Sequence, residues 1–264
     1  MKKIIALALA LILALSIMGC SKDKESSSAS KEEELIIEEV LTYGNFEYAV
    51  NEDGDFEIIG YTYSGADQIA VEIPSAIDGR PVTGIGTDAF KAITAMNAVT
   101  IPSSIEYIGD FAFYGCTSLT TVVIPDSVTS IGTGAFWGCD EMTSVTLSAS
   151  LKDLGDYAFW NCSKLTSVTL PETLETIGEG AFWNCMAITS VTVPASVKSV
   201  GRGAFIYCEA LAVAEFKGDK VEIGEGAFDY CPETLKLVGA SAESTVKEFA
   251  DDEKITFEVA PKAE

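Results

Sequence analysis

Six cysteines form the first set of residues whose spacing suggests chemistry. They recur every 23 residues, at Cys116, Cys139, Cys162, Cys185, Cys208 and Cys231. A file with one thiol per repeat cannot close a tetrahedral zinc site, and the chain has no histidine to activate a thiol as a nucleophile. Neighbouring repeats would bring cysteine Cα atoms near disulfide distance. Because each cysteine lies among apolar positions, we instead expect a column of buried, reduced thiols that pack as small hydrophobic side chains.

A second file consists of aromatic side chains. The residue that follows the recurring Ala-Phe pair is aromatic in four consecutive repeats, at Tyr114, Trp137, Trp160 and Trp183, and these include all three tryptophans of the chain. Exposed rings offer a ligand a large contact area at low entropic cost, so the file is a candidate binding site for a protein or a glycan. The alternative, which we favour, is that the rings stack on one another and cover the turn beneath them.

Short hydroxyl side chains form a third candidate surface, at alternate outward positions of the expected strands. The candidate ligand-binding residues of this face are Thr121, Ser144, Thr146, Ser167, Thr169, Ser190 and Thr192. They form a neutral face on an acidic molecule, and solenoid proteins commonly bind ligands through one face of their sheet. The high β-propensity of threonine explains the same pattern without a ligand, and the sequence does not decide between the two.

All three files are positioned by one repeat. Its phenylalanines follow one another at intervals of 23 residues, at Phe90, Phe113, Phe136, Phe159, Phe182, Phe205 and Phe228. Seven occurrences at a fixed period indicate a repeat protein. A glycine lies four residues before each phenylalanine, as Gly155 does before Phe159. This column predicts either a positive φ or a close approach between neighbouring turns.

The repeat at residues 119–141 shows which elements to expect. Leu119, Val122 and Ile124 predict a short strand with one buried face, and Pro125 ends it. Val128 and Ile131 have helical spacing, but the glycines that follow argue against a regular helix. We therefore expect a turn or a short 3₁₀ segment there.

Both ends of the repeat array depart from the motif and are expected to cap it. Residues 43–63 alternate apolar and polar positions around the turn-forming residues 51–55, which predicts a β-hairpin. Residues 241–250 predict a short helix with Ser241 as its N-cap. Residues 255–259 predict a final strand. Such caps cover the strand edges and apolar surface that an open stack would expose.

The N-terminus has the pattern of a bacterial export signal. Lys2 and Lys3 precede an apolar run at residues 4–17 that is short for a membrane span. Ile17-Met18-Gly19-Cys20 resembles a lipobox, so Cys20 is the expected lipidation site and residues 1–19 the lipoprotein signal peptide. Residues 21–34 lack large apolar side chains, and we expect residues 20–41 to be a disordered tether.

Composition narrows the possible functions. Lys and Arg number 17 against 40 Asp and Glu, giving a formal net charge of −23. This charge argues against binding to nucleic acid and against peripheral binding to anionic lipid, so the lipid anchor is the only membrane contact we expect. No phosphate-binding glycine loop, metal-ligand set or nucleophile–base pair is visible, so we expect no catalytic residues, metal or cofactor.

The repeat motif points to a family. Leu-x-x-Val-x-Ile-Pro-x-Ser-Val-x-x-Ile-Gly-x-x-Ala-Phe-x-x-Cys resembles the BspA-like, or Treponema-type, leucine-rich repeat. The resemblance implies a β-rich horseshoe of the α/β class, a leucine-rich-repeat solenoid of seven 23-residue coils with a concave parallel sheet. In this scheme residues 42–264 form the domain, with an N-terminal cap at 42–70, repeats at 71–237 and a C-terminal cap at 238–264.

The resemblance also implies a bacterial surface or secreted protein associated with adhesion. We therefore expect a non-enzymatic cell-surface module that binds an extracellular protein or glycan through its solenoid surface and is anchored by lipid. One alternative is a carbohydrate-binding accessory lipoprotein of an uptake system, and another is a structural spacer on the cell surface. A shared fold does not identify the ligand.

Overall fold

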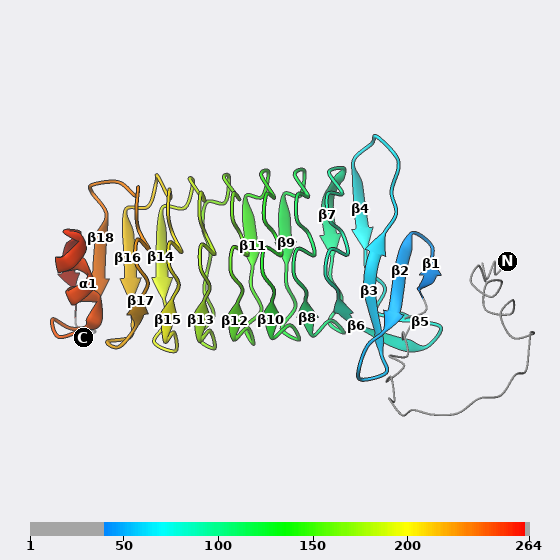
Figure 1. The fold of residues 1–264 in the computed structure, drawn as a ribbon, viewed down its shortest axis with the longest axis horizontal. Coiled ribbons are helices and arrows are strands. Elements are labelled where there is room, and N and C mark those ends of the chain that lie inside the picture. The colour runs from blue at the N-terminus through cyan, green and yellow to red at the C-terminus, as the bar shows by residue number, and fades with distance from the viewer. Residues whose placement is uncertain (1–39, 262–264) are drawn as a thin grey trace, which may run out of the picture. The chain divides into compact units, whose positions relative to one another are not determined.

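The repeats fold into the stacked turns of a β-solenoid. The computed structural model describes residues 40–261, which form about nine turns that follow one another along one axis (Figure 1). The leucine-rich-repeat solenoid expected from the motif is thus confirmed. The signal peptide, Cys20 and nearly all of the expected tether lie outside the described residues. Leu41, placed at the end of that tether, instead begins the first strand, β1 (Leu41–Tyr43).

One parallel sheet runs through the repeats without interruption. Its strands are β6 (Arg80–Ile85), β8 (Tyr107–Ile108), β10 (Ser130–Ile131), β12 (Asp153–Leu154), β13 (Thr176–Ile177), β15 (Ser199–Val200) and β17 (Glu222–Ile223). Each strand pairs with its equivalent one repeat away, as Ile131 does with Leu154. The turn expected near Ile131 is present at residues 133–138, but Ser130 and Ile131 themselves form a two-residue strand whose partners are 23 positions away in the sequence.

The strand predicted from Leu119, Val122 and Ile124 is present as β9 (Thr121–Val123), but its sheet is divided. One part contains β4 (Ile69–Glu72), β7 (Met96–Thr100), β9 and β11 (Ser144–Thr146). The other contains β14 (Ser190–Val193), β16 (Val213–Phe216), β18 (Lys236–Gly239) and β19 (Thr256–Val259). Ser167 and Thr169 lie in the intervening turn, outside any strand. The single sheet expected to carry the hydroxyl face is therefore two four-stranded sheets.

The N-terminal cap contains the predicted hairpin. Strands β2 (Phe46–Val50) and β3 (Phe56–Tyr61) pair antiparallel, and β1 adds to the outer side of β2. Asn51 shapes the connecting turn, since its side-chain oxygen accepts hydrogen bonds from the amides of Asp53 and Asp55 at 3.2 and 2.9 Å. Strand β3 pairs in parallel with β6, which in turn pairs antiparallel with β5 (Ala76–Ile77), so the hairpin continues the long sheet.

The C-terminal cap consists of a helix and the predicted last strand, β19. Helix α1 (Thr245–Glu253) begins after Ser244 and not after Ser241, so the predicted helix start is wrong by three residues. The Ser241 hydroxyl instead accepts a hydrogen bond from the Glu243 amide and donates one to the Asp219 carboxylate. Val246 and Ala250 are the buried residues of the helix. Strand β19 pairs in parallel with β18 and covers its edge.

The core is organised by the phenylalanine file. All seven phenylalanine side chains are buried. Adjacent rings are nearly parallel, with centroids 5.0 to 5.6 Å apart. Tyr61 and Phe46 contact the first ring, Phe90, and Phe249 of helix α1 contacts the last, Phe228. Both caps thus supply an aromatic side chain where the file would otherwise end.

The glycine column allows the turns to pack closely. A Cβ atom on Gly155 would lie 2.5 Å from the carbonyl carbon of Gly132 in the preceding turn. The φ angle of Gly155 is not positive, so a close backbone approach, and not a left-handed conformation, explains this column.

Candidate binding surfaces

The cysteine file lies inside the solenoid, as predicted. Five of the six thiols are fully buried, and Cys231 is half-buried. Each Sγ atom donates a hydrogen bond to the carbonyl of a phenylalanine, as Cys162 does to Phe136 at 3.3 Å. The same bond recurs for each of the six cysteines, with distances of 3.1 to 3.4 Å. The thiols therefore link neighbouring turns without disulfides.

Burial also favours the protonated form of these thiols. Desolvation raises the pKa of Cys116 and of Cys231 to about 12. It also raises the pKa of the four thiols between them. The reactive form of cysteine is the thiolate, which is hardly populated at neutral pH when the pKa is raised in this way. The file contributes packing and hydrogen bonds to the fold.

The tryptophan file lies along one edge of the solenoid, and its rings stack on one another. Trp137 and Trp160 are 4.2 Å apart between centroids with planes 11° from parallel, and Trp160 and Trp183 are 5.0 Å apart at 17°. Tyr114 meets Trp137 edge to face at 5.3 Å. All four side chains are half-buried. Both faces of the Trp160 ring are therefore covered by the neighbouring tryptophans, and neither face is open to a ligand.

Two further aromatic residues, which were not predicted from the sequence, lie beside the tryptophan file. Phe111 and Tyr157 have φ angles of +54° and +57°, in a column where other turns have Gly134 or Gly180 with similar φ. A Cβ atom on Gly134 would lie 2.5 Å from the Phe111 ring, so that ring lies over the glycine of the next turn. Tyr157 has the same relation to Gly180. The signal in the sequence was the alternation of aromatic residue and glycine at a spacing of 23.

The hydroxyl face is exposed and unpaired. Its seven candidate residues are exposed, and none of their side chains makes a hydrogen bond with another described residue. The neighbouring column differs, because Thr120, Thr143 and Thr166 each donate a hydrogen bond to a carbonyl of the preceding turn. Five of the seven residues lie on strands, namely Thr121, Ser144, Thr146, Ser190 and Thr192. Ser167 and Thr169 lie in the turn between the two sheets.

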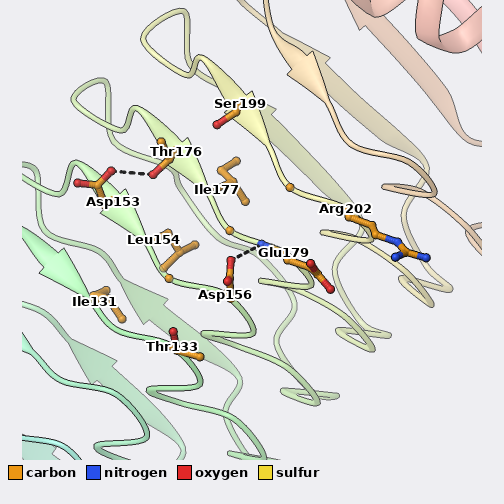
Figure 2. Close-up of a pocket in the computed structure, with 13 residues that line it drawn as sticks. Ile131, Thr133, Asp153, Leu154, Asp156, Thr176, Ile177, Glu179, Ser199 and Arg202 are labelled. Carbon is orange, nitrogen blue, oxygen red and sulfur yellow. Dashed lines mark hydrogen bonds between the residues drawn. The ribbon is translucent and has the colours of Figure 1, made fainter.

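A shallow groove of about 540 Å³, which was not predicted from the sequence, runs across the long sheet. Glycines 155, 178 and 201 line it, together with polar side chains on strands β12, β13 and β15 and just after them (Figure 2). Thr176 donates a hydrogen bond to Asp153, and the Glu179 amide donates one to Asp156, both at 2.7 Å. Arg202 extends away from these groups in Figure 2 and makes no ion pair with any described residue.

Tyr157 lies beside the tryptophan file and also contacts a residue of the groove. Its hydroxyl donates a hydrogen bond to the Glu179 carboxylate, and this bond, with partial burial and the nearby negative charge, raises the pKa of Tyr157 to about 12. Within residues 40–261, no cluster of three or more His, Cys, Asp or Glu side chains is placed to hold a metal ion. In the same range, no helix combines the length and hydropathy that crossing a membrane requires.

The stacked turns, buried files and exposed polar faces define a leucine-rich-repeat solenoid, and comparison with known proteins identifies its family. A family model described as the BspA type leucine rich repeat region, in six copies, matches residues 83–212. A solved leucine rich repeat protein of T. pallidum is 30% identical with a TM-score of 0.68, over 85% of this chain and 100% of that one. The chain belongs to the BspA-type leucine-rich-repeat family.

A second solved structure shows a related protein of greater length. It is a leucine rich cell surface protein of Faecalibacterium prausnitzii A2-165, 30% identical with a TM-score of 0.66, over 77% of this chain and 55% of that one. This chain thus spans about half the length of that relative. A comparison with curated proteins gives no match.

Proposed function

We propose that this protein is a non-enzymatic, lipid-anchored module of the bacterial cell surface that binds an extracellular protein through the hydroxyl face. Membership in the BspA-type family supports a repeat module with a binding role. A surface location is in keeping with the printed description of the F. prausnitzii relative as a cell surface protein.

The observation that carries the proposal is the unpaired state of the hydroxyl face. Seven exposed Ser and Thr side chains share one surface, and their hydroxyls are free to donate and accept hydrogen bonds. Short side chains lose little conformational entropy when a partner immobilises them. The face also lacks formal charge at these positions, although the chain as a whole carries −23. A partner would therefore meet hydrogen-bonding groups there with a low desolvation cost.

The tryptophan file supports a protein ligand more than a carbohydrate. A sugar ring packs against an open aromatic face, but Trp160 stacks on a tryptophan at 4.2 Å on one side and at 5.0 Å on the other. The ring edges that remain exposed offer little flat area. This arrangement weighs against the carbohydrate-binding accessory protein, for which the file was the main argument.

A charge substitution on the hydroxyl face tests the proposal. We expect the triple variant Ser144→Lys, Ser167→Lys and Ser190→Lys to weaken binding to any ligand found on an array of extracellular proteins by about tenfold or more, because long charged chains would block the contact. The matched control is Ser130→Lys, Thr176→Lys and Ser199→Lys, which adds the same charge on the long sheet. Loss of binding in the control alone would place the ligand at the groove instead, and the absence of any ligand would favour a structural spacer.

The lipid anchor is tested separately. Mass spectrometry of the mature N-terminus is expected to find Cys20 as the first residue, carrying acyl chains. Cys20→Ala should release the protein into the medium without changing its melting temperature, since residues 21–34 lack the large apolar side chains that a core contact needs. An unmodified N-terminus at another residue, with the wild-type protein free in the medium, would contradict the anchor.

A further inference from the structure

Two stacked tyrosines near the C-terminal end of the solenoid form an aromatic pair that remains open to solvent. The rings of Tyr207 and Tyr230 are 4.4 Å apart between centroids and 8° from parallel. Tyr207 is 37% exposed and Tyr230 is 68% exposed. Tyr230 therefore uses one ring face against Tyr207 and leaves most of the remaining ring accessible. No described aromatic ring other than Tyr207 contacts it.

The backbone at these two positions does not favour a large side chain. Tyr207 and Tyr230 have φ angles of +57° and +58°. The same column has Gly115 and Gly138 in earlier turns, followed by Asn161 and Asn184, and these residue types tolerate positive φ. A bulky residue in this region is strained, and such strain is concentrated at functional sites. The buried core does not explain the tyrosines, because the two rings stack on each other outside it.

The other end of the aromatic edge shows how this chain covers an exposed ring. Lys91 places its Nζ atom 5.6 Å from the centre of the Tyr114 ring and 5.9 Å from that of Phe111. A cation over an aromatic face is attracted by the negative potential of the ring. In the turn of Tyr230, the position equivalent to Lys91 is Asp229, and its carbonyl accepts a hydrogen bond from the Tyr207 amide at 3.0 Å.

Three acidic residues lie close to the tyrosine pair in the sequence. Asp229, Glu209 and Glu233 all lie within three residues of one of the two tyrosines, and all three are exposed. None of them takes part in an ion pair with a lysine or arginine among residues 40–261. The open tyrosine pair is thus flanked in the sequence by three exposed acidic residues, and none of them forms an ion pair with a described basic residue.

We propose that the Tyr207–Tyr230 pair is a binding site for a lysine or arginine side chain of a basic partner protein. The ring face and the neighbouring carboxylates attract the same cationic group, and the net charge of −23 attracts a basic partner over a longer range. A neutral sugar would also pack against the ring but would gain nothing from the negative charge. The site uses different residues from the hydroxyl face and does not depend on the function proposed for that face.

The test is binding of a fluorescein-labelled pentalysine peptide to the full chain, followed by anisotropy at low ionic strength. We expect the double variant Tyr207→Asn and Tyr230→Asn to bind about tenfold more weakly than the wild type. Asparagine is the appropriate replacement because Asn161 and Asn184 occupy the same column with the same φ. The matched control is Tyr43→Asn, which removes an exposed tyrosine from strand β1, and it should bind as the wild type does. Asp229→Asn provides a second variant, which should also weaken binding without changing a ring.

The possible outcomes distinguish a site for a cationic side chain from binding by overall charge and from a carbohydrate site. Equal binding by the wild type and by the double variant would overturn the proposal. Binding of the peptide would then be due to the overall negative charge of the protein. Equal binding of a peptide whose lysines are all acetylated would also overturn it, because that contact would need no cation. If cellotetraose bound in a tyrosine-dependent way and pentalysine did not, the pair would be a carbohydrate site and the proposal would be wrong.

Discussion

The phenylalanine file and the tryptophan file have the same spacing, one ring per turn, but they face different surroundings. The phenylalanines are buried, and every one of seven turns has the same residue. The column one residue later is half-exposed in its central turns, and its residues run Lys91, Tyr114, Trp137, Trp160, Trp183, Ile206 and Asp229. A ring at the interior positions fills a space that the turns before and after define, so only one shape fits.

This difference shows which part of a repeat can vary. At the edge, the backbone hydrogen bonds between turns are made whatever the side chain is, as in the bond from the Gly138 amide to the Trp160 carbonyl at 2.8 Å. The edge side chains are therefore free to differ from turn to turn. Constancy in the interior specifies the fold, whereas variation along the edge gives each turn its own surface chemistry. The tyrosine pair and the stacked tryptophans are two results of that freedom.

The largest expected effect comes from breaking the interior file. Phe159→Ala removes a fully buried ring that stacks on Phe136 at 5.2 Å and on Phe182 at 5.6 Å. Because both neighbouring turns are held by their own packing, the cavity cannot collapse, and we expect a loss of about 3–5 kcal/mol in the free energy of unfolding. Urea denaturation measures it. A loss below about 1 kcal/mol would mean that the turns relax into the space, and the contrast with the edge would disappear.

Breaking the edge file should cost less, and the cost should depend on the number of stacked neighbours. Trp160→Ser removes two stacking contacts and Trp183→Ser removes one. At about 1 kcal/mol for each stacked pair, we expect losses of about 2 and about 1 kcal/mol in the free energy of unfolding. The same urea titration measures both, with Phe159→Ala as the reference. Equal losses in the two variants would show that stacking does not determine the stability of the edge.

A triple replacement of the tryptophans by serine separates structure from binding. If the melting temperature collapses, the rings are structural cover for the turns beneath them. If stability holds and binding to every identified ligand is unchanged, the file has no part in recognition. Binding that fails while stability holds would restore the tryptophan file as a ligand site.

The interior of this protein was largely predictable from its sequence, and the edge was not. The period of 23 residues placed the phenylalanine and cysteine files, because a core position repeats whenever its surroundings repeat. Strand β10 could not be predicted, because two residues show no alternation and Ser130 and Ile131 pair only with residues one turn away. The division of the other sheet was equally invisible, since the turn of Ser167 and Thr169 keeps the motif and no residue in it explains the interruption.

At the candidate surfaces, sequence located the residues but not their orientation. The tryptophan column was evident, yet whether its rings lie face to face depends on side-chain torsions and on the distance between turns. Phe111 and Tyr157 were missed because a large residue is not expected at positive φ, and the local sequence does not reveal that backbone. Tyr207 and Tyr230 were missed for the same reason.

An expected effect as small as that of Trp183→Ser concerns the thiols, each of which donates a hydrogen bond to a phenylalanine carbonyl of the neighbouring turn. Cys162→Ser keeps a donor for the Phe136 carbonyl, which lies 3.3 Å from Sγ in the wild type. The hydroxyl is more costly to bury than the thiol, and we expect a loss of about 1 kcal/mol in the free energy of unfolding at pH 8 with reductant present. Urea titration of the variant beside the wild type measures it.

The pH dependence of that difference identifies the thiol as its cause. Burial raises the pKa of Cys162 in the folded state above its ordinary value of 9.0. The unfolded chain therefore releases this proton first, so the stability due to the thiol is complete below pH 9 and falls as the pH rises toward the folded-state pKa. Serine does not ionise in this range. At pH 10 the wild type should have lost about 1.4 kcal/mol that the variant has not, and the gap between them should close or reverse. If the difference in the free energy of unfolding between wild type and variant stayed constant from pH 8 to pH 10, burial would not be keeping the Cys162 thiol neutral. The cysteine file would then resemble the variable edge residues more than the interior phenylalanines.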